Sequence, residues 1–174
     1  MGNSSHPTLY DADDDGDLDL VVGKEYLGQV DFYPNVNPLN PSPFQSDSLN
    51  SNFGGISVSD AGFLIGNASP YFIERNGEAL LLVGGSSGKT NAYVLDSDSL
   101  FTGSFAIEAE QWGGIDVGAE ATPFAYDINN DGFMDILYGN RRGGLSLYST
   151  IVTDSSQILS LSLIHISEPT RQIR

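Results

Sequence analysis

One segment near the N-terminus reads Asp11-Ala12-Asp13-Asp14-Asp15-Gly16-Asp17-Leu18-Asp19-Leu20-Val21-Val22-Gly23, with six aspartates in nine residues and an apolar run directly after them. Unneutralised carboxylates at this density repel one another and favour an open, solvated chain. Carboxylates at alternate positions 11, 13 and 15 can instead converge on one hard cation, because Gly16 permits a sharp turn. Every donor in the segment is oxygen, so the pattern favours calcium over zinc. The alternative interpretation is a solvated acidic turn.

Two further ligands follow from this interpretation. The backbone carbonyl of Asp17 can add an oxygen, and Asp19 can close the shell from the start of a strand. The segment is not an EF-hand loop, because its twelfth position, counted from Asp11, is Val22 instead of a bidentate glutamate. The flanking residues are also rich in β-formers and show no helical period.

A second segment repeats the spacing. It reads Asp127-Ile128-Asn129-Asn130-Asp131-Gly132-Phe133-Met134-Asp135, and the apolar run Ile136-Leu137-Tyr138-Gly139 follows it. Both segments share the pattern D-x-[DN]-x-D-G-x-x-D. Asn129 still offers a side-chain carbonyl oxygen, so this substitution lowers the charge of the loop without removing a ligand. Two independent occurrences of the spacing strengthen the prediction of a metal loop.

Both segments resemble the calcium loops of FG-GAP/VCBS-type repeats, which build the blades of integrin-α-like β-propellers. The resemblance covers most of residues 7–150, and the two loops are its only specific motifs. It implies two sets of calcium ligands. The first set is Asp11, Asp13, Asp15 and Asp19 through their side chains and Asp17 through its carbonyl; the second is Asp127, Asn129, Asp131 and Asp135 through their side chains and Phe133 through its carbonyl.

Other markers also repeat along the chain. Pro7, Pro70 and Pro123 each stand four residues before an acidic position. The sequence Phe53-Gly54-Gly55-Ile56-Ser57-Val58 returns as Trp112-Gly113-Gly114-Ile115-Asp116-Val117. These intervals of 53 to 63 residues suit a four-stranded propeller blade. We therefore expect an all-β fold of about three four-stranded antiparallel blades of an incomplete β-propeller: residues 1–58 with a calcium loop, 59–117 degenerate, and 118–160 truncated, with a calcium loop.

Each repeat is predicted to contain a strand, a loop, a strand, a turn and a strand. The expected strands are Thr8–Tyr10, Leu18–Val22 and Val30–Tyr33, then Tyr71–Ile73, Ala79–Val83 and Asn91–Leu95, then Phe124–Tyr126, Met134–Tyr138 and Leu145–Tyr148. The middle strands are apolar on both faces, as blades packed between two neighbours require. The Gly-Gly-Ile-x-Val segments are predicted to supply the outer strands, and residues 34–52 a surface excursion.

The middle repeat lacks a complete loop. Its segment Glu74-Arg75-Asn76-Gly77-Glu78 is shorter than the other two and contains a positive side chain. A cation there would meet too few ligands, so we expect no metal. We expect Arg75 instead to form an ion pair with Glu74 or Glu78.

The two ends of the chain carry different signals. The N-terminal residues lack the basic start and apolar core of a signal peptide. Residues 161–171 resemble the in-frame translation of a transposase mosaic-end sequencing adapter, so we expect residues 161–174 to be a non-native tail. We accordingly expect a gene fragment whose export signal lies upstream. Residues 161–174 are excluded from the fold prediction.

The amino-acid composition excludes several classes of partner and of catalytic site. There are 7 basic and 23 acidic residues, giving a net charge of −16, which argues against nucleic acid and anionic membranes as partners and favours cations. No apolar run is long enough to span a membrane. There is no cysteine, and the only histidine outside the tail is His6, so no nucleophile–base pair can be proposed. Paired carboxylates can serve a glycosidase, but the loops already account for the best pairs.

Two functions remain open. The first is a calcium-stabilised, secreted or cell-surface binding or adhesion module that contacts protein or glycan and is not itself an enzyme. The second is the accessory or partly catalytic propeller of a larger extracellular enzyme, such as a polysaccharide-degrading one. Sites of the affinity found in extracellular modules fill only where calcium is plentiful, which favours a location outside the cytosol.

Overall fold

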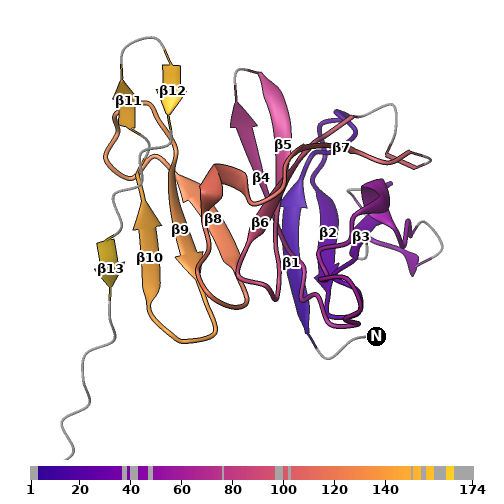
Figure 1. Ribbon diagram of the computed structural model, residues 1–174. Coiled ribbons are helices and arrows are strands. Elements are labelled where there is room, and N and C mark those ends of the chain that lie inside the picture. The colour runs from indigo at the N-terminus through magenta and orange to yellow at the C-terminus, as the bar shows by residue number, and fades with distance from the viewer. Residues whose placement is uncertain are drawn as a thin grey trace, which may run out of the picture.

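The computed structural model is all-β, with three antiparallel sheets that lie side by side in chain order (Figure 1). It describes residues 4–36, 39, 43–46, 49–75, 77–96, 100–101 and 103–149, together with the backbone of 151–153, 156–158 and 164–166. Among these residues, no helix has the length and hydropathy of a membrane span.

The sheets follow the three repeats. The first contains β1 (Ser5–Tyr10), β2 (Asp19–Lys24) and β3 (Val30–Tyr33). The second contains β4 (Ser69–Arg75), β5 (Glu78–Gly84), β6 (Thr90–Val94) and β7 (Ala106–Ala109). The third contains β8 (Thr122–Tyr126), β9 (Asp135–Gly139), β10 (Leu145–Tyr148) and β13 (Ile164–Ile166); β11 (Ile151–Thr153) and β12 (Ser156–Ile158) form a separate hairpin.

The second sheet lies between the other two. Its first strand, β4, contacts β1 and β2 on one side and β8 on the other. The first strands of successive repeats therefore stand next to one another, and each sheet extends outward from them. Figure 1 shows the first and third sheets at opposite ends of an open row, without closure into a ring.

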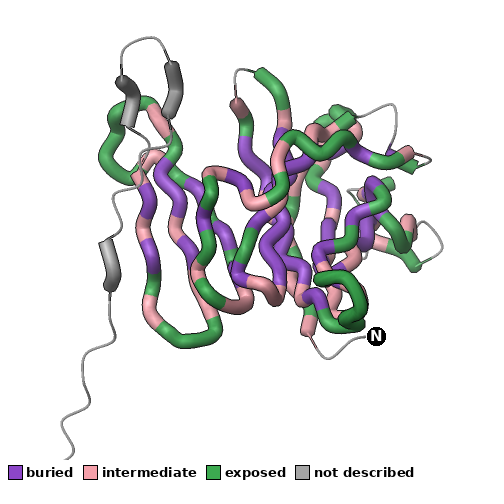
Figure 2. The backbone as a smooth tube through the Cα atoms, in the orientation of Figure 1, coloured by how far each residue is buried: buried purple, intermediate pink, exposed green. Residues whose placement is uncertain are grey.

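The strand β5 shows why the sheets stack. Leu81 and Val83 belong to the cluster of buried side chains between the first and second sheets. Leu80 and Leu82 point the opposite way, into the cluster between the second and third sheets. All four are fully buried, so the strand is apolar on both faces as predicted. Figure 2 shows the buried positions concentrated along the middle strands.

The prediction of outer strands from the Gly-Gly-Ile-x-Val segments is wrong. Phe53–Gly55 and Trp112–Gly114 form short 3-10 turns, labelled η2 and η4. Both glycines of each pair adopt left-handed backbone conformations, with φ between 61° and 68°, which L side chains disfavour and which interrupts a strand. The turns bury the aromatic rings of Phe53 and Trp112 between the sheets.

Two strand counts also differ from the prediction. The first sheet has three strands, and its outer position is taken by one isolated bridge between Phe32 and Asn50. In the second sheet, the fourth strand is β7, which precedes the Trp-Gly-Gly turn. The third sheet gains its fourth strand from β13, which pairs with β10. An open sheet edge accepts any extended segment through its backbone, so this pairing does not bear on the predicted non-native origin of residues 161–174.

Successive sheets meet through the same contact twice. A Cβ atom added to Gly23 would lie 2.0 Å from the carbonyl oxygen of Ala68, and one added to Gly84 would lie 2.1 Å from that of Ala121. The Ala68 amide donates a hydrogen bond to the Lys24 carbonyl, and Ala121 donates in the equivalent way to Gly85, both at 2.9 Å. The two interfaces are thus repeats of one arrangement.

Candidate metal centre

The first acidic loop joins β1 to β2 and is folded by its own carboxylates. The Asp11 carboxylate accepts hydrogen bonds from the backbone amides of Asp15 (3.1 Å) and Gly16 (3.0 Å). The Asp15 carboxylate accepts one from the amide of Asp17 at 2.9 Å. Asp14 and Gly16 adopt positive φ angles of 59° and 92°, which Asp tolerates and Gly favours. The predicted turn at Gly16 is confirmed.

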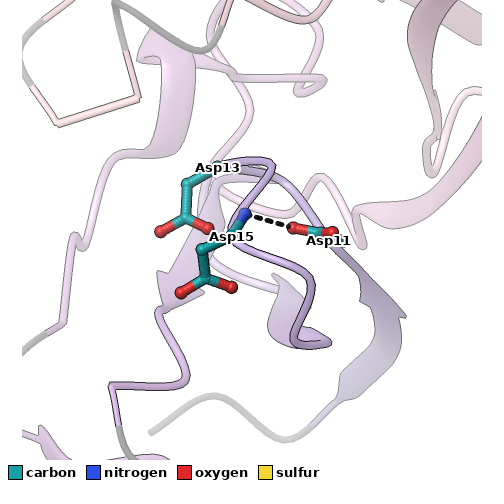
Figure 3. Close-up of side chains that lie close together, drawn as sticks. All are labelled: Asp11, Asp13 and Asp15. Atoms are coloured by element: carbon teal, nitrogen blue, oxygen red, sulfur yellow. Dashed lines mark hydrogen bonds between the residues drawn. The ribbon is translucent and has the colours of Figure 1, made fainter.

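This turn gathers three carboxylates. One oxygen from each of Asp11, Asp13 and Asp15 lies within 4.8 Å of the other two. Figure 3 shows the Asp13 and Asp15 side chains beside each other, with Asp11 bonded to the backbone nitrogen of Asp15. The Oδ1 atom of Asp13 is buried and has no hydrogen-bond donor among the described residues. Oxygen atoms so arranged fit a hard cation such as Ca²⁺.

The negative charges of the carboxylates in this cluster repel one another. Burial raises the pKa of Asp13, and the nearby charges of Asp15 and Asp11 raise it further. Burial likewise raises the pKa of Asp19, where the charges of Asp13 and Asp15 add to the effect. A bound cation would relieve both costs, because it supplies the opposite charge and satisfies the buried oxygen.

Asp19 anchors the base of the loop. It is fully buried, and its two oxygens accept hydrogen bonds from the amides of Ala12 (3.0 Å) and Asn35 (2.8 Å). The side-chain amide of Asn35 also donates to the Leu18 carbonyl at 3.3 Å. Asn35 was not predicted, because it lies outside the repeated motif and reaches the loop only through the fold.

The second acidic loop joins β8 to β9 and reproduces these hydrogen bonds. Asp127 accepts from the amides of Asp131 (3.1 Å) and Gly132 (2.9 Å), and Asp131 accepts from that of Phe133 (2.9 Å). Asp135 accepts from the amide of Ile128 at 3.1 Å, as Asp19 does from that of Ala12. The left-handed positions recur as well, at Asn130 with φ 58° and Gly132 with φ 87°.

Asn129 distinguishes the second loop from the first. Its side-chain oxygen accepts from the Asp131 amide, and its nitrogen donates to Asp131 Oδ2, both at 2.9 Å. The predicted side-chain ligands of the second loop therefore carry one negative charge fewer than those of the first, and one of their oxygens is already engaged within the loop. The carbonyls of Asp17 and Phe133 stay predicted ligands, since only their amides make the bonds described above.

The middle repeat joins its first two strands, β4 and β5, by a tight turn instead of an acidic loop. Arg75 and Glu78 pair directly across a tight turn that contains Gly77, so no loop of this kind forms. The expected ion pair of Arg75 with Glu74 or Glu78 is wrong: its guanidinium contacts Glu108 of β7 at 2.7 Å. Leu80 occupies the strand position of Asp19 and Asp135 and is fully buried, so an apolar side chain replaces the loop anchor.

A polar cavity of about 530 Å³ lies at the opposite ends of the first strands from the acidic loops. Its lining includes His6, Glu25, Asn67, Glu120 and Arg141. Glu120 accepts a hydrogen bond from the Asn67 side chain at 3.2 Å and lies 3.5 Å from the Arg141 guanidinium. Asn67 and Glu120 hold left-handed φ angles of 47° and 54°, a conformation that asparagine tolerates and that is uncommon for glutamate.

Comparison of the chain with protein-family models, with curated proteins and with solved structures found no match.

Proposed function

We propose that the chain is part of a calcium-stabilised β-propeller that acts outside the cytosol, secreted or on a cell surface, as a binding or adhesion module for protein or glycan. The observation that carries the proposal is the equivalence of the two acidic loops. Segments with different residues at several positions form the same set of backbone-to-carboxylate hydrogen bonds at the same place in two sheets.

In this proposal the cation has a structural role. It would be held by Asp11, Asp13, Asp15 and Asp19 with the carbonyl of Asp17, and in the second loop by Asp127, Asn129, Asp131 and Asp135 with the carbonyl of Phe133. Neutralising these groups fixes the connection between the first two strands of a sheet. At about 1 mM calcium, a dissociation constant on the order of 0.1–1 mM gives roughly 0.4–1.4 kcal/mol per site.

The polar cavity supports the binding part of the proposal. Its hydrogen-bonding side chains suit a hydroxyl-rich ligand such as a glycan. It also lies away from both loops, so the cation would stabilise the scaffold without touching the ligand. Glycan binding measured with calcium and with EGTA, for the wild type and Glu120→Gln, tests this part; no glycan bound in calcium would contradict it.

Calcium binding itself is tested by isothermal titration calorimetry. We expect two sites in the wild type, one in Asp13→Ala, which removes the ligand oxygen that asparagine keeps at the equivalent position 129, and two in the control Asp60→Ala, which removes an exposed carboxylate outside both loops. Absence of binding to the wild type, or two unchanged sites in Asp13→Ala, would contradict the proposal.

A further inference from the structure

The two end sheets each carry an outward face that lacks a neighbouring sheet among the described residues. Gly23, Gly84 and Gly139 occupy equivalent places at the ends of β2, β5 and β9. Aligning the three sheets on these glycines assigns every strand position an equivalent in the other two. This alignment shows what would cover each outward face.

The outward face of the third sheet is apolar. It consists of Tyr126, Leu137, Leu145 and Leu147, on the opposite side of the strands from the buried cluster. Phe124 lies on the same side, but its ring contacts Tyr71 of the second sheet, with centroids 5.2 Å apart. Tyr126 is 62% exposed and Leu145 42%. Their equivalents in the first sheet are Tyr10, which stacks on Phe72 with ring centroids 4.3 Å apart, and Val30, which is fully buried.

The outward face of the first sheet is equivalent to the faces by which the second and third sheets contact the sheet before them. It consists of Pro7, Leu9, Leu20 and Val22. Leu9 is 52% exposed, whereas its equivalents, Phe72 and Ala125, are 9% and 3% exposed because the preceding sheet covers them. Pro7 is exposed too, although the equivalent prolines of the other two sheets are buried.

Gly139 lies at the position where the outward face of a third sheet would contact the outward face of a first sheet. Gly23 and Gly84 each pack against an alanine carbonyl of the following sheet, but a Cβ on Gly139 would meet only the Thr122 Cβ, at 3.8 Å. Ser5 stands two residues before Pro7, as Ala68 stands before Pro70. The carbonyl of Ser5 from another copy would thus take the place beside Gly139.

We propose that two copies of this chain associate head to tail, with the outward face of the third sheet in each copy covered by the outward face of the first sheet in the other. A contact between two different faces closes into a ring or continues as a filament. Two copies bring together six sheets, within the four to eight that close a propeller. The inference rests on the propeller arrangement of the proposed function but not on calcium, so failure of the loops to bind calcium leaves it intact.

Cross-linking tests which faces meet. The chain has no cysteine, so Leu9→Cys and Tyr126→Cys can be made singly and joined by a short bis-maleimide. A covalent dimer is expected when the two variants are mixed and not from either alone. The doubly substituted chain is expected to give closed dimers without a ladder of larger products. Efficient cross-linking of either single variant with itself, or a ladder from the double variant, would overturn the proposal.

The mass in solution tests the number of copies. Light scattering at about 100 µM protein and about 0.15 M salt is expected to give twice the 18.6-kDa mass of the chain. Gly139→Val is expected to weaken association at least about tenfold, because the added methyls would displace the Ser5 carbonyl. The circular dichroism spectrum should not change, since Gly139 has open space around it and no left-handed φ.

Ile107→Ser is the matched control. Ile107 lies on β7, is 53% exposed and belongs to neither outward face, so its replacement should leave the dimer unchanged. A monomeric wild type at that concentration would overturn the proposal and leave the outward faces to other partners. The proposal would also be overturned if Gly139→Val left the dissociation of the dimer unchanged. A light-scattering mass that rose beyond the dimer mass with increasing protein concentration would overturn it as well.

Discussion

The carboxylates of the acidic loops have two different roles, one of which is found only at Asp13 of the first loop. Asp11 and Asp19 in the first loop, like Asp127 and Asp135 in the second, accept backbone amides and fold the loop. Asp13 has a buried oxygen without a donor and neighbours of like charge. The first group stabilises the loop with or without a cation, whereas Asp13 destabilises it until a cation arrives.

Replacing Asp13 is therefore predicted to have opposite effects with and without calcium. In EGTA, Asp13→Asn should raise the thermal unfolding temperature, because it removes a buried charge close to Asp15. With calcium, the same substitution should lower it, because a ligand charge is lost. Thermal unfolding followed by circular dichroism checks both, and a change of the same sign in both buffers would contradict the prediction.

The pH dependence follows from the same groups. The pKa values of Asp13 and Asp19 are raised above the ordinary 3.8, so the folded protein holds these protons more tightly than the unfolded chain. Their favourable contribution to stability is present below pH 3.8 and is lost as the pH rises through the raised values. In EGTA, urea unfolding of the wild type relative to Asp13→Asn should show this loss. A difference that is constant with pH would contradict it.

Loss of the anchors is predicted to be costly in both buffers. Asp19→Ala would leave one buried and one partly buried amide without an acceptor, and Asp135→Ala would leave one partly buried amide among the described residues. At about 1–3 kcal/mol for each amide, we expect losses of roughly 2–6 and 1–3 kcal/mol in the free energy of unfolding. Chemical denaturation measures both, and equal losses would refute the assigned difference between the anchors.

At the scale of elements, apolar alternation and turn residues predicted nine strands, and each overlaps a strand of the structure. The strand β7 was missed, because Ala106–Ala109 is mostly exposed and has no apolar face to recognise. The error at Phe53–Gly55 came from treating two glycines as part of an extended segment. The partners Arg75–Glu108 and Asn35–Asp19 depend on how distant segments pack, which one sequence does not reveal.

The contact of Gly84 with the following sheet predicts that replacing glycine by alanine has different effects at Gly84 and at the equivalent Gly139. Gly84→Ala would force a methyl group against the Ala121 carbonyl, which belongs to a backbone that cannot easily move. We expect a loss of about 1–3 kcal/mol. In protein dilute enough to be monomeric, Gly139→Ala should change the free energy of unfolding by no more than about 0.5 kcal/mol, because its surroundings in one chain are open. Equal losses in the two variants would contradict this difference in packing.

At the scale of the whole molecule, the repeats predicted three sheets, and the structure shows an open row of three. Closure into a propeller is not visible in this row, because its end faces lie apart. The net charge of −16, with two acidic loops on the end sheets, is the electrostatic basis for proposing a cation as the partner of this row.

The most direct measurement compares thermal unfolding in about 1 mM calcium and in EGTA for the wild type and for the double variant Asp13→Ala/Asp131→Ala, which removes one ligand side chain from each loop. Two filled sites should raise the wild-type unfolding temperature by roughly 2–10 °C, whereas the double variant should show no rise. No calcium effect on the wild type, or an equal effect on the double variant, would contradict the account of two structural calcium loops.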